Sequence, residues 1–125
     1  MNLPEGLRYT GDHEWITTDS SARVGVTDYA QDQLGDVVYV ELPAVGQDVE
    51  AGGFVCEIES TKSVSEIFAP ISGVISAINL DVIDYPDRIN SDPYGAGWLF
   101  AITPNDPADI DALMSASEYR THIGA

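Results

Sequence analysis

The sequence has few of the side chains that build reactive centres. Its 125 residues include one cysteine, Cys56, and two histidines, His13 and His122. A single cysteine cannot form an internal disulfide, and the apolar run GGFVCEI around it predicts a buried structural thiol. With so few histidines and cysteines, neither a zinc site nor a Ser-His-Asp or Cys-His nucleophile is expected. An enzyme in its own right is therefore the least favoured class of function.

Positive charge is also scarce. Lysine and arginine contribute 5 residues against 21 acidic ones, which gives a formal net charge of −16. Such a chain repels phosphate backbones and anionic lipids, so nucleic acid and membrane surfaces are not expected as partners. No apolar run approaches the length of a transmembrane helix, and the N-terminus has no apolar segment behind a basic start, so we expect no secretory signal. A partner with basic patches, or a cationic ligand, would be attracted instead.

What the chain does contain is a series of short apolar runs separated by glycine- and proline-marked turns. A short helix is expected at 28–34, between Thr27 as its N-cap and Gly35 at its end. These signals favour one domain over residues 1–125, a small barrel or sandwich rather than a series of βαβ units. The pattern predicts strands at 22–26, 36–43, 54–60, 64–70, 72–79 and 98–103, with loops at 44–53 and over most of 81–97.

The hydrophobic period changes near the C-terminus, which predicts one or two short helices there. The spacing favours a helix that begins near residue 106 and a second that begins near residue 115. The signals are Asp106 as a cap, Pro107 at the first helical position, Ile110, Leu113 and Met114 on one helical face, and Ser115 with Glu118 as a capping box.

Lys62 is the only lysine, and it lies between two predicted strands. The residues around it, STKS, are small or polar as an exposed turn requires, which predicts a hairpin with Lys62 at its tip. A primary amine on a flexible stem can be acylated, and a rigid turn beneath it suits a prosthetic group that must travel. The alternative is that an acidic, lysine-poor composition serves solubility and that this lysine has no special role.

Several quoted segments resemble a known family. The frame LPAVGQDVEAGGFVCEIESTKSVSEIFAPISGVI resembles the biotinyl/lipoyl carrier domains, in which an acceptor lysine lies between two strands. Thr61 and Ser63 flank the lysine where biotin acceptors typically have methionines, which indicates lipoate. The segments YTGDHEWI, VGVTDYAQDQLGDVVYVELP, INSDPYGAGWLF and LMSASEYR extend the likeness to nearly the whole chain. Together they are similar to the H proteins of the glycine cleavage system.

The resemblance implies a mainly β fold, a barrel-sandwich hybrid of two small antiparallel sheets with short helices near residues 28–34 and at the C-terminus. It implies lipoate, amide-linked to Lys62, and no active site of the protein's own. The lipoyl arm would take the aminomethyl group of glycine from the pyridoxal-phosphate-dependent decarboxylase (P protein) to the folate-dependent aminomethyltransferase (T protein). Dihydrolipoyl dehydrogenase (L protein) would then reoxidise the arm, and a lipoylating enzyme would be a fourth partner.

The same resemblance implies a place in the cell and an oligomeric state. Such a carrier is expected to be a monomer in the cytoplasm of a bacterium, or in the mitochondrial matrix if a transit peptide has been removed.

The resemblance also singles out the residues around the lysine. Ser60, Thr61 and Ser63 are expected to shape the attachment turn rather than to act chemically. Glu59 and Glu66 flank the turn and are either recognition marks for the lipoylating enzyme and the other partners or ordinary exposed strand acids; both readings stay open.

A second group of residues matches a family cleft that shelters the loaded arm. Glu14 falls at a position near that cleft, where a carboxylate could pair with the cationic amine of the cargo; the alternative is a solvated loop acid. His13 precedes it, and we expect a hydrogen-bonded structural histidine rather than a proton carrier. Some members have a histidine on the short helix that faces the cleft. The matching residue here is Gln33, which can donate a hydrogen bond but cannot titrate.

Two other functions remain open at this point. One is a lipoyl carrier used differently, as a relay of lipoate to other enzymes or in another amino-group pathway. The other is an acidic β-domain that binds partners without any cofactor. Lipoylation at Lys62 would separate the carriers from the cofactor-free domain.

Overall fold

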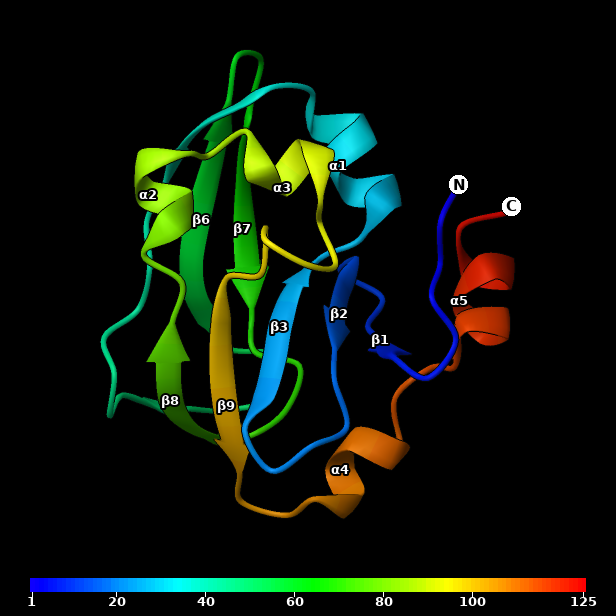
Figure 1. The fold of residues 1–125 in the computed structure, drawn as a ribbon. Coiled ribbons are helices and arrows are strands. Elements are labelled where there is room, and N and C mark those ends of the chain that lie inside the picture. Colours follow the sequence, from blue (N-terminus) through cyan, green and yellow to red (C-terminus); the bar gives the residue numbers. More distant parts are fainter.

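The computed structural model describes all 125 residues and contains two antiparallel sheets (Figure 1). The prediction of a mainly β fold with two antiparallel sheets and short helices is confirmed, and the strand pairing does not close into a barrel. One sheet has six strands in the order β1 (Arg8–Tyr9), β2 (Glu14–Ile16), β3 (Ala22–Val26), β9 (Phe100–Pro104), β8 (Gly73–Ile78) and β5 (Asp48–Val49). The other has three, in the order β4 (Val37–Val40), β6 (Phe54–Ser60) and β7 (Val64–Phe68).

The two sheets share one hydrophobic core. It contains 21 buried residues drawn from both sheets, for example Val24 and Ile102 from the first and Ile58 and Ile67 from the second. Each such side chain contributes about 1.5–3 kcal/mol when it leaves water, so this cluster supplies most of the driving force for folding. Cys56 belongs to it and is buried, as predicted, and burial raises the pKa of its thiol to about 12.

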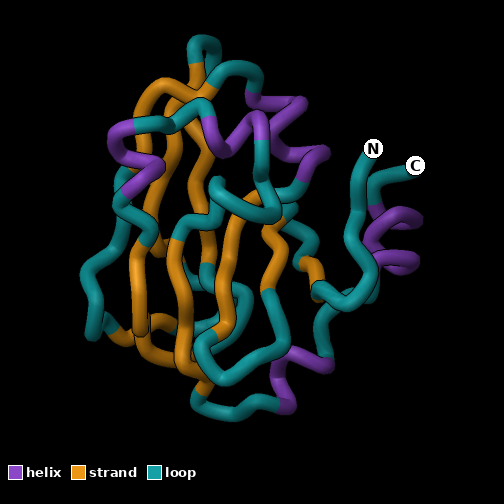
Figure 2. Tube along the Cα trace, in the orientation of Figure 1, coloured by secondary structure: helices purple, strands orange, loops and turns teal.

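A smaller cluster joins the two ends of the chain. Tyr9 on β1 stacks on Tyr119 of α5 (Ala116–His122), with ring centroids 4.9 Å apart, and Trp15 is buried in the same cluster. The two termini consequently lie side by side at the edge of the larger sheet (Figure 2). No helix in the structure combines the length and the apolar character needed to cross a membrane.

Local signals placed several elements correctly. Strands β3 and β6 have the predicted limits, and helix α1 (Asp28–Leu34) lies between the predicted caps. The Thr27 hydroxyl accepts a hydrogen bond from the Ala30 amide, and Gly35 ends the helix with a φ of 77°, which favours glycine. The capping box of Ser115 and Glu118 at the start of α5 is also confirmed.

Other limits were wrong because pairing partners lie far away in sequence. The predicted strand at 36–43 is reduced to β4, and the one at 98–103 begins two residues later, as β9. The predicted loop at 44–53 contains β5, which pairs with β8, and strands β1 and β2 were not expected. Strands of two or three residues carry too little alternation to be recognised from sequence alone.

The C-terminal helix pattern was partly wrong. Asp106 and Pro107 do precede α4 (Ala108–Asp111), and the Asp106 carboxylate accepts a hydrogen bond from the Ala108 amide. Because α4 ends at Asp111, however, Leu113 and Met114 do not share a helical face with Ile110. Met114 instead forms an isolated antiparallel bridge with Tyr9, and this long-range pairing ends the helix early.

The segment 81–97, expected to be mostly loop, contains two short helices, α2 (Asp81–Asp84) and α3 (Arg88–Ser91). Val82 and Ile89 anchor them in the main core, so burial overrides the Asp- and Pro-rich composition. Helix α3 lies beside α1, and α2 lies on the far side of α3, at the end of the molecule where the β6–β7 hairpin projects (Figure 1).

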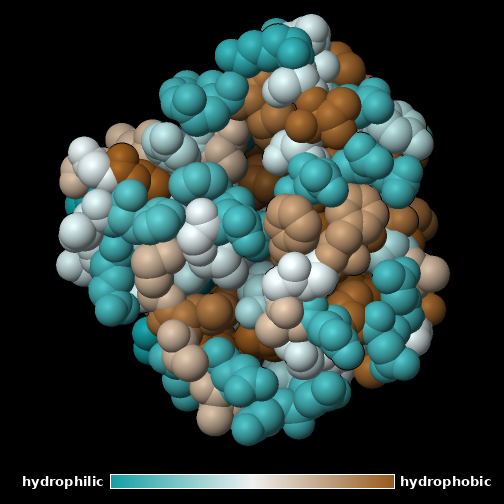
Figure 3. All heavy atoms as spheres, turned by 180° about the vertical axis from the view of Figure 1, so that it is seen from behind, coloured by the Kyte–Doolittle hydropathy of each residue, from teal (hydrophilic) through white to brown (hydrophobic).

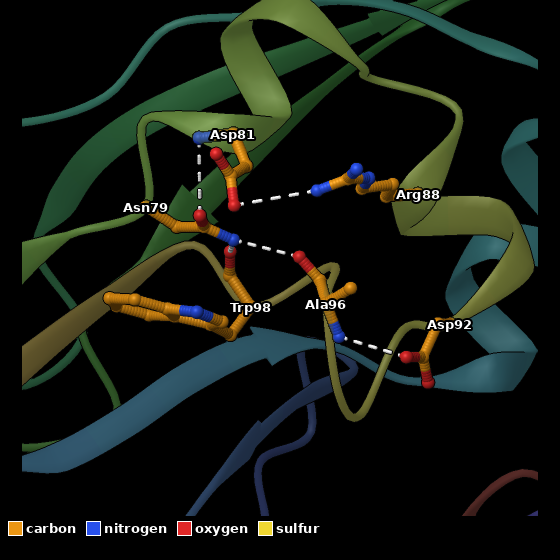
Figure 4. Close-up of polar contacts among 6 residues, drawn as sticks. All are labelled: Asn79, Asp81, Arg88, Asp92, Ala96 and Trp98. Atoms are coloured by element: carbon orange, nitrogen blue, oxygen red, sulfur yellow. Dashed lines mark hydrogen bonds and ion pairs between the residues drawn. The ribbon is translucent and has the colours of Figure 1, made fainter.

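The buried Asn79 fixes the two ends of this segment (Figure 4). Its amide nitrogen donates to the carbonyl oxygens of Ala96 and Trp98 at 2.8 and 2.7 Å, and its oxygen accepts from the Asp81 amide at 3.2 Å. The pair of Arg88 with Asp81, at 3.4 Å, adds an exposed ionic contact across the same segment.

We predict that Asn79→Ala lowers the free energy of unfolding by about 2 kcal/mol, because it removes three hydrogen bonds made by a buried side chain. Chemical denaturation would measure this loss. Asn105→Ala, at an exposed asparagine whose side chain makes no hydrogen bond within the protein, is the control and should change stability little. Equal stability of the two variants would contradict the assigned role of Asn79.

Candidate functional site

Lys62 stands at the tip of the β6–β7 hairpin, as predicted, and its side chain is exposed. The Ser60 amide donates to the Ser63 carbonyl at 2.8 Å and closes the turn. The Ser60 hydroxyl oxygen lies 3.2 Å from the Lys62 amide and 3.1 Å from the Ser63 amide and accepts from both. A serine side chain thus replaces backbone partners inside the turn, which keeps the four residues in one conformation.

The turn is also tied to the segment that follows α1. The Thr61 amide donates to the Asp36 carbonyl at 3.0 Å. The stem of Lys62 passes close to Gly35, where an added Cβ would lie 3.3 Å from the lysine Cε. Gly35 therefore has two roles that only glycine combines, ending the helix at positive φ and leaving room for the lysine stem.

Asn90 on α3 holds this segment from the other side. Its amide nitrogen donates to the Gly35 carbonyl at 2.8 Å, and its oxygen accepts from the Val37 amide at 2.9 Å. These bonds flank Asp36, whose carbonyl receives the turn amide. No local pattern points to Asn90, because its partners are more than 50 positions away.

A cavity of about 330 Å³ opens between the hairpin and α1. The hairpin contributes residues 63–65 and Ile67, the helix contributes Tyr29 and Gln33, and the loop before β2 contributes Asp12 and His13. Half of its lining is apolar and half polar. It begins at Ser63, next to the lysine, so a chain attached to Lys62 could fold back into it.

His13 is a hydrogen-bonded histidine, as expected. Its Nδ1 shares a hydrogen bond of 2.9 Å with the Tyr119 hydroxyl, which in turn lies 2.8 Å from the Thr27 hydroxyl. Burial, followed by the neighbouring His122, lowers the pKa of His13. The sequence could not show this network, because His13 and Tyr119 are 106 positions apart.

Glu14 is the most deeply buried carboxyl group, with only 1% of its surface exposed. One carboxylate oxygen accepts from the Thr10 hydroxyl at 2.8 Å and the other from the Phe68 amide at 2.9 Å. Burial is the main influence on its pKa and raises it to about 7, against the lowering effect of these two hydrogen bonds. Glu14 does not line the cavity beside the hairpin; it borders a separate hollow near Pro70 and Leu113.

The remaining sequence candidates are distributed around the turn. Glu59 and Glu66 are exposed on β6 and β7, and Gln33 lines the cavity. Asp12 was not singled out from the sequence although it lines the cavity. Its place directly before His13 in the GDHEW segment was the available signal.

Comparison with known proteins agrees with this geometry. A sequence model of a family described as glycine cleavage H-protein matches residues 7–124. The chain belongs to the glycine cleavage H-protein family. The glycine cleavage system H protein of Micrococcus luteus is 53% identical over 124 residues, with 97% of each chain covered. That of Mycobacterium bovis is 55% identical over 117 residues, which cover 92% of this chain and 87% of the relative.

The fold is shared with a solved member of the H-protein family. The crystal structure of a glycine cleavage system H protein from Mycobacterium marinum has a TM-score of 0.90 and 44% sequence identity, covering 98% of this chain and 100% of that one.

The buried Glu14 predicts a specific dependence of stability on pH. Its pKa is raised from 4.5 to about 7, so the folded protein keeps a proton that the unfolded chain releases over this interval. The resulting stability is fully present below pH 4.5 and is lost as the pH rises through about 7, by up to about 3 kcal/mol. His13 acts in the opposite direction, because a lowered histidine pKa removes stability as the pH falls below 6.5.

Denaturation of the wild type and of Glu14→Gln between pH 4.5 and pH 7 would measure this effect. We expect the variant to lose less stability than the wild type as the pH rises. Glu5→Gln, at an exposed acid, should follow the wild type. Parallel curves for all three proteins would show that Glu14 has no raised pKa.

Proposed function

We propose that the protein is a non-catalytic lipoyl carrier of the glycine cleavage system, with lipoate amide-linked to Lys62. The chain belongs to the H-protein family and has a single lysine. The observation that supports the proposal most directly is that this lysine lies at the exposed tip of a hydrogen-bonded turn. Because no other side chain offers a primary amine, attachment through a lysine amide has a single site. The family's place in a multienzyme system agrees with a carrier rather than an enzyme.

The residues around Lys62 fit such a group. The amine is exposed, its stem is guided past Gly35, and a cavity of about 330 Å³ begins beside the turn. When attached, lipoate would supply a disulfide that takes the aminomethyl group of glycine at the P protein, gives it up at the T protein and is reoxidised by the L protein. The protein's own residues would anchor, orient and shelter the arm.

Different residues of the cavity would contribute apolar contact, hydrogen bonding and negative charge. Val26, Leu34 and Ile67 offer an apolar wall to a hydrocarbon chain, which excludes water from the bound arm. Gln33 can donate a hydrogen bond there, and the bond from Tyr119 holds the His13 ring in one place. Asp12 gives the cavity a carboxylate that would attract a cationic amine.

A direct contact between Glu14 and the amine of the cargo would require a change in the structure. To pair directly with the amine, its carboxylate would have to leave the Thr10 hydroxyl and the Phe68 amide. Asp12 meets the amine without such a change. We therefore propose that Asp12 makes the direct contact and that Glu14 supports the loop that presents it.

The remaining expectations form part of the same proposal. Curated bacterial H proteins match nearly the whole chain, which supports one carrier domain in the cytoplasm of a bacterium. We propose that the carrier acts as a monomer, because its exposed hairpin must enter the P, T and L proteins and the lipoylating enzyme in turn.

Intact mass after incubation with a lipoate ligase, lipoate and ATP tests the attachment. We expect one lipoyl increment on the wild type and none on Lys62→Arg. The double variant Lys62→Arg/Arg120→Lys keeps the composition but places the lysine on α5, and it should also remain unmodified. No increment on folded wild type would refute the carrier function, and modification of the double variant would show that the turn is not what the enzyme recognises.

A second experiment tests the cavity. The carrier is loaded by the P protein with glycine, and the spontaneous release of ammonia is followed over time. We predict that Asp12→Asn releases its cargo about fivefold faster, since one exposed ion pair contributes up to about 1 kcal/mol. Asp32→Asn, on an exposed face of α1 outside the cavity, is the matched control. Faster release from Glu14→Gln but not from Asp12→Asn would assign the direct contact to Glu14 instead.

A further inference from the structure

The outward face of the three-stranded sheet carries a row of carboxylates. Glu57 on β6 is paired directly with Glu66 on β7. On the other side, the Glu41 amide donates to the Glu57 carbonyl at 3.0 Å, which continues the β4–β6 register past Val40. Directly paired residues point to the same face of a sheet, so Glu41, Glu57 and Glu66 stand in line across all three strands.

This arrangement is unfavourable for the isolated protein. Like charges directly opposite each other destabilise a strand pair. No cation in the protein offsets them, because the only ion pair joins Arg88 to Asp81 on the helical segment. The four arginines lie on other elements, β1, β3, α3 and α5, and the stem of Lys62 lies beside Gly35. The sheet therefore keeps three carboxylates in register without internal compensation.

Apolar side chains border the row on both sides. Toward the tip, Tyr39, Glu59 and Val64 form the next row, with 53% of Tyr39 and 54% of Val64 exposed. Away from the tip, Phe54 is paired with Phe68 and is 50% exposed. Figure 3 views the molecule from this side and shows hydrophobic and hydrophilic atoms intermixed. Aromatic side chains are enriched in protein interfaces, so their exposure here favours a contact surface.

The position of this face relative to Lys62 favours one kind of partner. The inward face of the hairpin meets α1 across the cavity, and its outward face is exposed at Glu59, Val64 and Glu66. An enzyme that must bring its active site to the lysine amine can approach along this exposed face. Its own surface would need basic side chains to meet three carboxylates and apolar side chains to meet Tyr39 and Phe54.

We propose that the outward face of β4, β6 and β7, centred on Glu41, Glu57 and Glu66, is the docking surface for the lipoylating enzyme, which meets it with a basic surface. This inference rests on the proposed carrier function. It extends recognition from Glu59, Glu66 and the turn to Glu57 and Glu41, which continue the row of Glu66 across β6 and the end of β4. The charge repulsion within the row is relieved only when the enzyme is bound, so the same residues that weaken the free sheet strengthen the complex.

Steady-state lipoylation by a lipoate ligase tests the proposal, with the carrier as the varied substrate. The face variant is Glu41→Gln/Glu57→Gln/Glu66→Gln. The control is Glu5→Gln/Asp109→Asn/Asp111→Asn, which removes the same charge from exposed positions on the N-terminal segment and on α4. We expect the face variant to raise KM at least about tenfold at low salt with kcat unchanged, and the control to change KM less than about twofold.

Salt and heat provide two independent readings. Raising the ionic strength from about 0.01 to 0.15 M shortens the Debye length from about 30 to 8 Å, so the KM of the wild type should rise steeply and that of the face variant should not. The face variant should also unfold at a higher temperature than the wild type, because the cross-strand repulsion is gone.

The outcomes separate this inference from the carrier function. A face variant with the KM and salt dependence of the wild type would overturn the docking surface and leave the carrier function intact. Equal changes of KM in the face variant and the control would assign the effect to net charge and would also overturn the docking surface. A wild type that accepts no lipoate would refute both.

Discussion

The presentation of Lys62 depends on one chain of hydrogen bonds. Asn90 holds the backbone on both sides of Asp36, the Asp36 carbonyl receives the Thr61 amide, and the Ser60 hydroxyl fixes the amides of Lys62 and Ser63. This chain begins on α3, a helix anchored in the main core by Ile89. The tip of a two-stranded hairpin, normally a mobile place, is thereby connected to the most rigid part of the molecule.

A rigid turn suits a travelling group because it confines mobility to the arm. A flexible hairpin would add conformational entropy that every partner enzyme would have to remove on binding. With the turn fixed, the enzymes meet the same backbone each time and only the arm needs to adapt. The cavity beside β7 is also formed by elements held in place. The Thr61–Asp36 bond and Gly35 connect α1 to the hairpin on its two sides.

The sequence predicted those features that depend on neighbouring residues. Thr27 and Gly35 set the limits of α1, and STKS indicated the turn at Lys62. Features that depend on distant contacts were missed, because a pattern in one segment contains no information on its partner. Burial of Val82 and Ile89 folds an Asp- and Pro-rich segment into two helices, and Met114 pairs with Tyr9 instead of extending α4. For the same reason the GDHEW segment suggested a carboxylate near the cleft, whereas only the fold shows that Asp12 lines the cavity and that Glu14 is buried outside it.

Part of the acidic composition is placed in a specific pattern on the three-stranded sheet. Solubility alone requires exposed acids but not three of them in direct cross-strand register, where each repels the next. A sheet selected only for stability would alternate the charges or place threonine and valine at these positions. The row lies on the sheet that carries Lys62 at its hairpin tip, with exposed aromatic side chains on either side. Repulsion in the free protein and attraction in a complex are two consequences of the same three carboxylates, so stability and recognition change in opposite directions when any of them is neutralised.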